Sequence, residues 1–123
     1  MPLLRDVFIA LSENAVLNDA SKKIGLKFGA NKVVGGITVD ETIERIKDIN
    51  SQGMSVSFDN LGEFVTNKTD ATKEKDLILK MIQAIGEEGV DASASIKLSQ
   101  IGLNIDYDFC LDNVREIMDA AKA

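Results

Sequence analysis

Two stretches of this sequence decide the fold: Met54-Ser55-Val56-Ser57-Phe58-Asp59 and Ser93-Ala94-Ser95-Ile96-Lys97-Leu98. Polar and apolar residues alternate in both, so that every second side chain points to the same face of a strand. Each polar face reads Ser-x-Ser-x-charge, and the charge is Asp59 in the first stretch and Lys97 in the second. The pattern predicts two similar strands, each with one apolar and one polar face.

Helical patterns follow each of these strands. The first predicted helix begins at Thr69 or Asp70 and ends at Gly86 and Gly89, and the second begins after Asp106. Their apolar faces consist of Ile78, Met81, Ile82 and Ile85 in the first helix and of Leu111, Val114, Ile117, Met118 and Ala121 in the second. The order strand, helix, strand, helix predicts parallel strands joined by a right-handed crossover, and hence an α/β fold.

The first 53 residues are predicted to be helical. Apolar spacing favours one helix around residues 3–11 and another over residues 15–23, before Gly25 and Gly29 break the pattern. Thr38 and Glu41 have the spacing of a capping box at the start of a third helix, which Gly53 closes as a left-handed cap. Its predicted buried face consists of Val39, Ile43, Ile46 and Ile49. We therefore predict a helical segment over 1–53 and two strand-helix units over 54–123.

Composition narrows the possible functions. The chain has 123 residues and a net charge of −6, with thirteen acidic and seven basic residues in 51–123. This charge disfavours a nucleic-acid partner, although a basic cluster at Lys22, Lys23, Lys27 and Lys32 could contact a membrane or nucleic acid instead of being a solvated helix end. No apolar stretch approaches the ~20 residues of a transmembrane helix, and no secretory signal is recognisable. We expect a cytoplasmic protein.

Cysteine and histidine usage excludes several chemistries. The chain has no histidine, which disfavours His-based zinc sites and Ser-His-Asp or Cys-His catalysis. Its one cysteine, Cys110, stands among Phe109, Leu111 and Val114, and we predict that it is a buried packing residue. No metal site is predicted.

Asp59, Glu63 and Lys97 are the candidate site residues. Asp59 and Lys97 end neighbouring parallel strands, where α/β proteins place their functional residues, and they are predicted to lie close together. Lys97 could pair with a substrate carboxylate or polarise a cofactor, and Asp59 and Glu63 could gate or polarise a substrate. The residues alone leave a second interpretation open, in which Asp59 and Lys97 form an ion pair without any ligand and Glu63 is an ordinary surface residue.

Four separated segments of the sequence carry a family resemblance. The two specific ones are the Asp59-x-Leu-Gly-Glu63 turn, followed by Phe64 and Val65, and the segment Ser95-Ile96-Lys97-Leu98-Ser99-Gln100-Ile101-Gly102-Leu103, followed by Ile105 and Asp106. Two further segments are Leu11-Ser12-Glu13-Asn14 and Gly25-Leu26-Lys27-Phe28-Gly29-Ala30. In order and spacing these segments resemble the N-terminal portion of monofunctional bacterial proline dehydrogenases, and chance agreement is improbable.

The resemblance implies a (β/α)8 barrel preceded by helices, which binds FAD and oxidises L-proline to Δ1-pyrroline-5-carboxylate. Electrons would then pass to a membrane quinone, so the enzyme could be peripheral to the membrane. By the same resemblance, Lys97 would help hold the proline carboxylate and Asp59 would line the floor of the pocket. Glu63 would form an ion-pair gate with an arginine late in the barrel.

The length of the chain departs from this family pattern. A (β/α)8 barrel needs ~250 residues, and this chain supplies only the first two strand-helix units. We therefore expect a fragment that is catalytically incomplete, holds no FAD by itself and self-associates through its open sheet edges. The alternative is a free-standing α/β interaction or oligomerisation module without catalysis.

Overall fold

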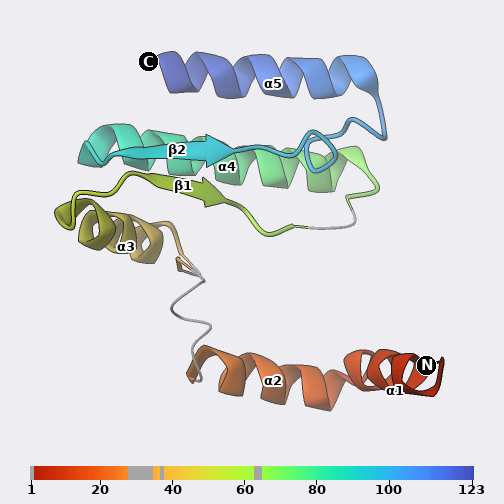
Figure 1. Cartoon of the computed structure of the whole chain (residues 1–123). Coiled ribbons are helices and arrows are strands. Elements are labelled where there is room, and N and C mark those ends of the chain that lie inside the picture. The colour runs from red at the N-terminus through yellow and green to blue at the C-terminus, as the bar shows by residue number, and fades with distance from the viewer. Residues whose placement is uncertain (1, 28–34, 37, 63–64) are drawn as a thin grey trace. The chain divides into compact units, whose positions relative to one another are not determined.

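The computed structural model describes residues 2–27, 35–36, 38–62 and 65–123, and it divides the chain into two units, 1–35 and 36–123. Figure 1 shows the elements of both units along the chain. They are α1 (Pro2–Ser12), α2 (Ala15–Lys27), α3 (Val39–Ser51), β1 (Val56–Asp59), α4 (Lys68–Glu88), β2 (Ala92–Ser95) and α5 (Tyr107–Lys122). The division into domains at residues 53 and 54 stays a prediction.

The first unit contains the two predicted helices. The side-chain oxygen of Asn14 accepts a hydrogen bond from the backbone N–H of Val16 at 3.1 Å and so starts α2. The helix continues through Gly25 to Lys27, four residues beyond the predicted end. A glycine inside a helix costs only about 1 kcal/mol relative to alanine, which is too little to end a helix by itself. Gly29 lies outside the described residues.

Helix α3 begins and ends as predicted. The backbone N–H of Glu41 donates to the hydroxyl of Thr38 at 3.3 Å, and the N–H of Thr38 donates to the Glu41 carboxylate at 3.3 Å, which completes the capping box. Just past the end of the helix, Gly53 has a φ of 80°, the predicted left-handed conformation. Ile43 and Ile46 are buried on the predicted face.

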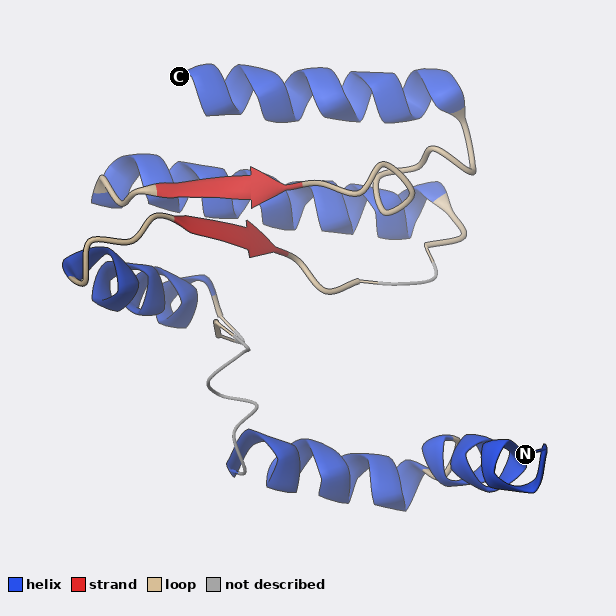
Figure 2. Cartoon of the chain, in the orientation of Figure 1, coloured by secondary structure: helices blue, strands red, loops and turns tan. Residues whose placement is uncertain are grey.

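Strands β1 and β2 are parallel and pair in register from Val56 with Ala92 to Asp59 with Ser95. In Figure 2, α4 lies behind both strands and forms the crossover between them. Val56 and Phe58 are half-buried, whereas Ser57 and Asp59 are exposed, which confirms the predicted alternation. The predicted strand bounds are wrong in detail, because β1 begins at Val56 instead of Met54 and β2 begins at Ala92 and ends at Ser95, before Lys97 and Leu98. After β2 the chain turns through a hydrogen bond from the N–H of Gln100 to the carbonyl of Lys97.

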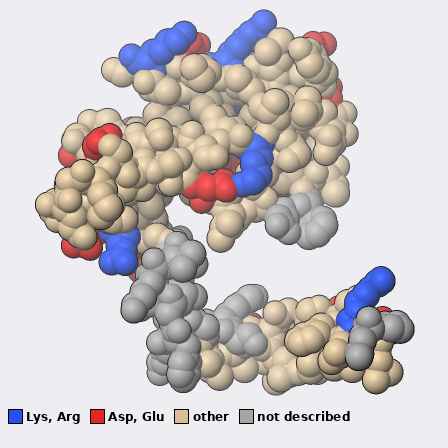
Figure 3. All heavy atoms as spheres, in the orientation of Figure 1, with Lys and Arg blue, Asp and Glu red and all other residues tan. Residues whose placement is uncertain are grey.

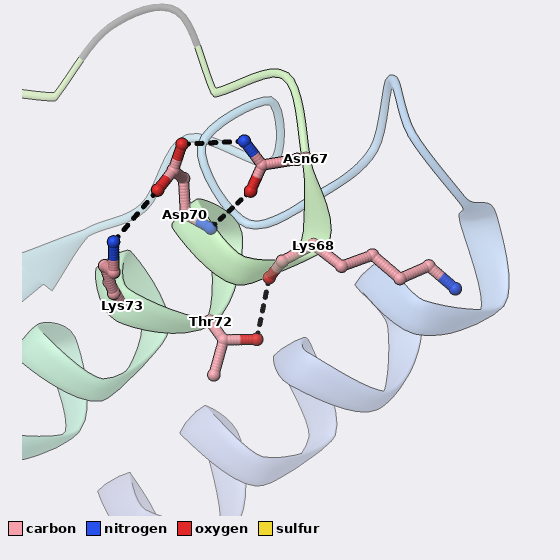
Figure 4. Close-up of polar contacts among 5 residues, drawn as sticks. All are labelled: Asn67, Lys68, Asp70, Thr72 and Lys73. Atoms are coloured by element: carbon pink, nitrogen blue, oxygen red, sulfur yellow. Dashed lines mark hydrogen bonds and ion pairs between the residues drawn. The ribbon is translucent and has the colours of Figure 1, made fainter.

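The predicted start of α4 at Thr69 or Asp70 is wrong. Asn67 is the cap, since its side-chain oxygen accepts from the N–H of Asp70 at 2.9 Å (Figure 4). Asp70 therefore lies in the first turn, where a negative charge is favourable. The helix continues through Gly86 and ends at Gly89, whose φ is 62°, so only the second of the two predicted end glycines acts as one.

The second unit has two adjoining hydrophobic clusters. One is formed by Ile43, Ile46 and Met81, against which the apolar face of the sheet packs. The other joins α4 and α5 and contains Ile78, Ile101, Cys110 and Ile117. Helix α4 contributes to both, since Ile78 and Met81 lie three residues apart along it.

Cys110 belongs to the second cluster. It is 2% exposed, which confirms the prediction of a buried packing residue, and burial raises the pKa of its thiol.

No helix within the described ranges combines the length and the apolar character that crossing a bilayer requires.

Candidate active site

The candidate site lies at the carboxyl ends of the two strands. Figure 2 shows both arrows pointing the same way, towards the ends at which α4 and α5 begin. Asp59 is the last residue of β1, and Lys97 follows the end of β2 by two residues. The polar face of the sheet leads up to them, with Ser57, Ser93 and Ser95 all exposed.

The structure brings Asp59 and Lys97 together as predicted. The ammonium of Lys97 donates a hydrogen bond to Oδ2 of Asp59 and forms an ion pair with it. The side chains are 51% and 37% exposed, respectively. The register explains this contact, because Ser95 lies opposite Asp59 and Lys97, two residues further on, faces the same way. In Figure 3 an acidic and a basic side chain touch on the face of this unit that is drawn.

The same contact is compatible with both interpretations of the sequence. An exposed ion pair contributes only about 0–1 kcal/mol to stability, so its presence gives little reason for a structural role. Substrate binding by Lys97 and Asp59 stays a prediction, and Glu63 lies outside the described residues.

Gln100 ties the two strand ends to each other, which the sequence analysis did not foresee. Its side-chain nitrogen donates to the carbonyl of Asn60 at 3.2 Å and to the carbonyl of Gly62. The residue is only 5% exposed, although it stands in a turn. The available signal was that Gln100 lies in the Ser95–Leu103 segment, one of the two specific segments of the family resemblance.

Glu74 of α4 holds the same turn from the other side. The side-chain amide of Asn60 donates to Oε2 of Glu74 at 2.5 Å. A Cβ atom on Gly62 would lie 2.9 Å from the same oxygen, so the turn passes close to this carboxylate. Nothing in the sequence pattern marked Glu74, because it stands among other charged residues of an amphipathic helix.

The segment after β2 packs closely against α5. Gly102 has a φ of 110°, and a Cβ atom there would come within 2.7 Å of the Phe109 ring. The side-chain amide of Asn113 donates to the carbonyl of Ile101 at 3.0 Å. These contacts give the Ser99–Leu103 part of the family-like segment a packing role.

The two helices that begin beside the site are connected through Asp106. As predicted, Asp106 caps α5, accepting from the N–H of Phe109 at 3.0 Å, and it pairs with the ammonium of Lys68 at 2.8 Å. That ammonium also lies 5.2 Å from the centroid of the Phe109 ring. The hydrogen bond from Lys68, then that from Phe109, lowers the pKa of Asp106.

Asp70 lies in the first turn of α4, beside the Asn67 cap. The side-chain amide of Asn67 and then the ammonium of Lys73 lower the pKa of this carboxyl (Figure 4). Both helix starts thus use side chains of the chain itself as caps. They give no argument for a phosphate or flavin at these positions. Within the described ranges, no group of three or more His, Cys, Asp or Glu residues is placed to hold a metal ion.

No family model matches the chain. Comparison with curated proteins gives 34% identity over 120 residues to Proline dehydrogenase 1 of Bacillus subtilis subsp. natto, covering 98% of this chain and 40% of that protein. Proline dehydrogenase 2 of the same organism is 33% identical over 122 residues, covering 99% of this chain and 40% of the relative. A proline dehydrogenase of Deinococcus radiodurans is 31% identical over 96 residues, covering 76% of this chain and 31% of the relative.

The chain thus spans about two fifths of the length of the Bacillus relatives that it matches, 40% in each case. These matches confirm the resemblance of nearly the whole chain to bacterial proline dehydrogenases, and their partial coverage is consistent with an N-terminal portion of such an enzyme.

Proposed function

We propose that this chain is the N-terminal portion of an FAD-dependent proline dehydrogenase, which oxidises L-proline to Δ1-pyrroline-5-carboxylate. The similarity to enzymes of that name over 98% of the chain supports the proposal. The observation that carries it is the contact between Lys97 and Asp59 at the carboxyl ends of two parallel strands. Parallel α/β folds place their binding and catalytic groups at this edge.

Lys97 is the residue that we propose to hold the proline carboxylate. An ammonium group has three N–H donors, and the hydrogen bond to Asp59 uses one of them. The side chain is 51% exposed, so a substrate carboxylate can approach the remaining donors. Asp59 fixes the direction of the ammonium and lines the floor of the pocket. Glu63, four residues further along the chain, is proposed as the gate residue that pairs with an arginine elsewhere in the enzyme.

The remainder of the proposal concerns the whole enzyme. β1 and β2 with their helices are proposed as the first two units of a (β/α)8 barrel, in which the polar sheet face turns inward. FAD supplies the hydride acceptor in that enzyme and a membrane quinone takes the electrons, in a cytoplasmic protein that can lie at the membrane surface. The 123-residue chain by itself is proposed to retain no FAD and to oxidise no proline.

A chimera tests this assignment. The chain is joined to the part of Proline dehydrogenase 1 of Bacillus subtilis subsp. natto that lies beyond the matched region, and it is compared with the chain alone. Flavin absorbance and proline-dependent dye reduction are measured for both proteins. We expect the chimera to retain flavin and reduce the dye, and the chain alone to do neither.

Two results would contradict the proposal. A folded chimera that binds flavin but is inert towards proline would show that this segment does not serve the enzyme. Flavin bound stoichiometrically by the chain alone would show that the chain is not the incomplete part that we propose. A discrete oligomer of the chain combined with an inert chimera would favour the interaction module.

A further inference from the structure

Gln100 lies where the pairing between β1 and β2 has ended. The register closes with Asp59 opposite Ser95, and the segment after β2 then turns through the hydrogen bond from the N–H of Gln100 to the carbonyl of Lys97. Beyond this point the side chain of Gln100 reaches across to the carbonyls of Asn60 and Gly62. It thereby continues the connection between the two segments that the strand ladder had provided.

Gln100 is bonded to Lys97 itself and to the residue that follows Asp59 in the chain. Its backbone N–H donates to the carbonyl of Lys97 at 3.0 Å. Its side chain holds Asn60, which follows Asp59 in the chain. Glu74 binds the side chain of Asn60 at 2.5 Å, so the first turn is held from two directions.

Solvent exposure indicates which of these contacts sets the geometry. The Lys97–Asp59 pair is exposed, and solvent screening makes the contribution of such a pair small. Gln100 is 5% exposed and donates to two carbonyls, so its hydrogen bonds are shielded from competing water. The ion pair therefore forms on a frame that Gln100 provides.

We propose that Gln100 is a positioning residue, which holds the ends of β1 and β2 so that Lys97 and Asp59 stay in contact. The importance of this role for catalysis rests on the proposed function. Gln100 acts through Lys97 and Asp59, and no contact between Gln100 and the substrate is required. In a binding site, a displacement of about 1 Å in the group that orients the substrate lowers the rate about a hundredfold.

Nuclear magnetic resonance of the full chain tests the proposal. The quantity measured is the nuclear Overhauser effect between the ε-methylene protons of Lys97 and the β-methylene protons of Asp59. We expect it to be present in the unchanged chain and lost or weakened several-fold in Gln100→Met. The matched control is Gln83→Met, because Gln83 is an exposed glutamine of α4 whose amide also donates a side-chain hydrogen bond, to Glu87 at 2.8 Å.

The melting temperature of each variant is measured on the same samples. A purely structural role would lower the melting temperature of Gln100→Met while leaving the Overhauser effect of the folded protein unchanged, and that result would overturn the proposal. If Gln100→Met does not fold, Gln100→Lys decides the matter, since lysine restores a donor of similar reach. We expect this variant to keep the Overhauser effect. Loss of the Overhauser effect in a folded Gln100→Lys protein would also overturn the proposal.

Neither proline nor flavin is needed for this measurement. An inert chimera would therefore overturn the proposed enzyme and leave the positioning role standing. An unchanged Overhauser effect in Gln100→Met would overturn the positioning role and leave the proposed enzyme standing.

Discussion

Lys97 offers the most direct test of binding chemistry at a single residue. Lys97→Met removes the charge and keeps most of the side chain. In the active chimera we expect KM for proline to rise about tenfold or more, because a hydrogen bond to a charged group contributes about 1.5–3 kcal/mol and 1.4 kcal/mol corresponds to tenfold. Steady-state kinetics with Lys80→Met, at an exposed lysine of α4, provide the control. An unchanged KM would remove Lys97 from the site.

Gly102 is a position at which only glycine fits. A Cβ atom there would lie 2.7 Å from Cδ1 of Phe109, and the φ of 110° is strained for any other residue. We expect Gly102→Ala to lower the free energy of unfolding by about 3 kcal/mol, from backbone strain and overpacking together. Urea denaturation measures this change.

Gly86→Ala is the matched control for that substitution. Gly86 lies inside α4, and a Cβ atom there would meet nothing within 4 Å. We expect this variant to be more stable than the unchanged protein by up to about 1 kcal/mol, because alanine favours the helix. Equal losses at the two glycines would show that the packing of Gly102 against Phe109 has no special importance.

The contact between Asp59 and Lys97 could be predicted from the sequence, whereas its support could not. Alternation with a period of two places both charges on one face, and the order of elements makes the strands parallel. Gln100 and Glu74 contact the residues after β1 from distant parts of the sequence, Gln100 from the turn after β2 and Glu74 from α4. No local sequence pattern predicts such contacts. Their roles depend on where the turns lie in space.

At the scale of elements, the start of α5 responds to pH through Asp106. Lys68 and the N–H of Phe109 hold the pKa of this carboxyl below its usual range. A lowered pKa means that the stabilisation is complete above the unfolded-state value of about 3.9 and is lost as the pH falls through the lower folded-state value. Asp106→Asn keeps a cap but loses the ion pair.

We therefore expect Asp106→Asn to melt below the unchanged protein near neutral pH, and the difference to shrink as the pH falls below about 4. Lys68→Met removes the other partner of the same ion pair. Its difference in melting temperature from the unchanged protein should shrink over the same pH range. Thermal melts followed by circular dichroism across this range measure both. A difference that stays constant down to the acid limit would contradict the assignment to Asp106.

The other helix starts show what local sequence can and cannot determine. Thr38 and Asp106 each precede a clear apolar pattern and were predicted correctly as caps. Asn67, Thr69 and Asp70 are all residue types that cap helices, and they stand within four positions of each other. The geometry of the incoming loop selects Asn67, and local preference alone does not.

For the molecule as a whole, the open edge of β1 has a consequence. The N–H of Val56 donates to the carbonyl of Asp91 beside β2, so in a regular strand the N–H of the next residue, Ser57, points to the other side. An unpaired strand edge is a template for pairing with another chain. We expect the isolated chain to self-associate with rising concentration, as sedimentation velocity would show.

Ser57→Pro removes the outward N–H without taking a bond from the pairing of β1 with β2, and it should shift the chain towards monomer. Ser57→Ala keeps this N–H and serves as the control. Equal association of the two variants would place the contact elsewhere.

Two parallel strands define the local α/β arrangement, but they do not determine whether the complete sheet is open or closed into a barrel. Their parallel register is compatible with an open sheet as well as with a barrel, since both use the same right-handed crossover. The number of strands and their closure depend on elements beyond β2. The barrel is therefore an expectation from family resemblance, and the polar sheet face does not determine it.

Because Cys110 is buried, the reactivity of its thiol can report local opening of the hydrophobic cluster around it. It is the one cysteine of the sequence, and its side chain is 2% exposed, where α5 packs against Ile78 of α4 and Ile101 of the segment after β2. A thiol-modifying reagent reaches it only when this packing opens, and the raised pKa keeps the reactive thiolate scarce. Under conditions where reclosing is fast, the modification rate measures the free energy of that opening without any engineered label.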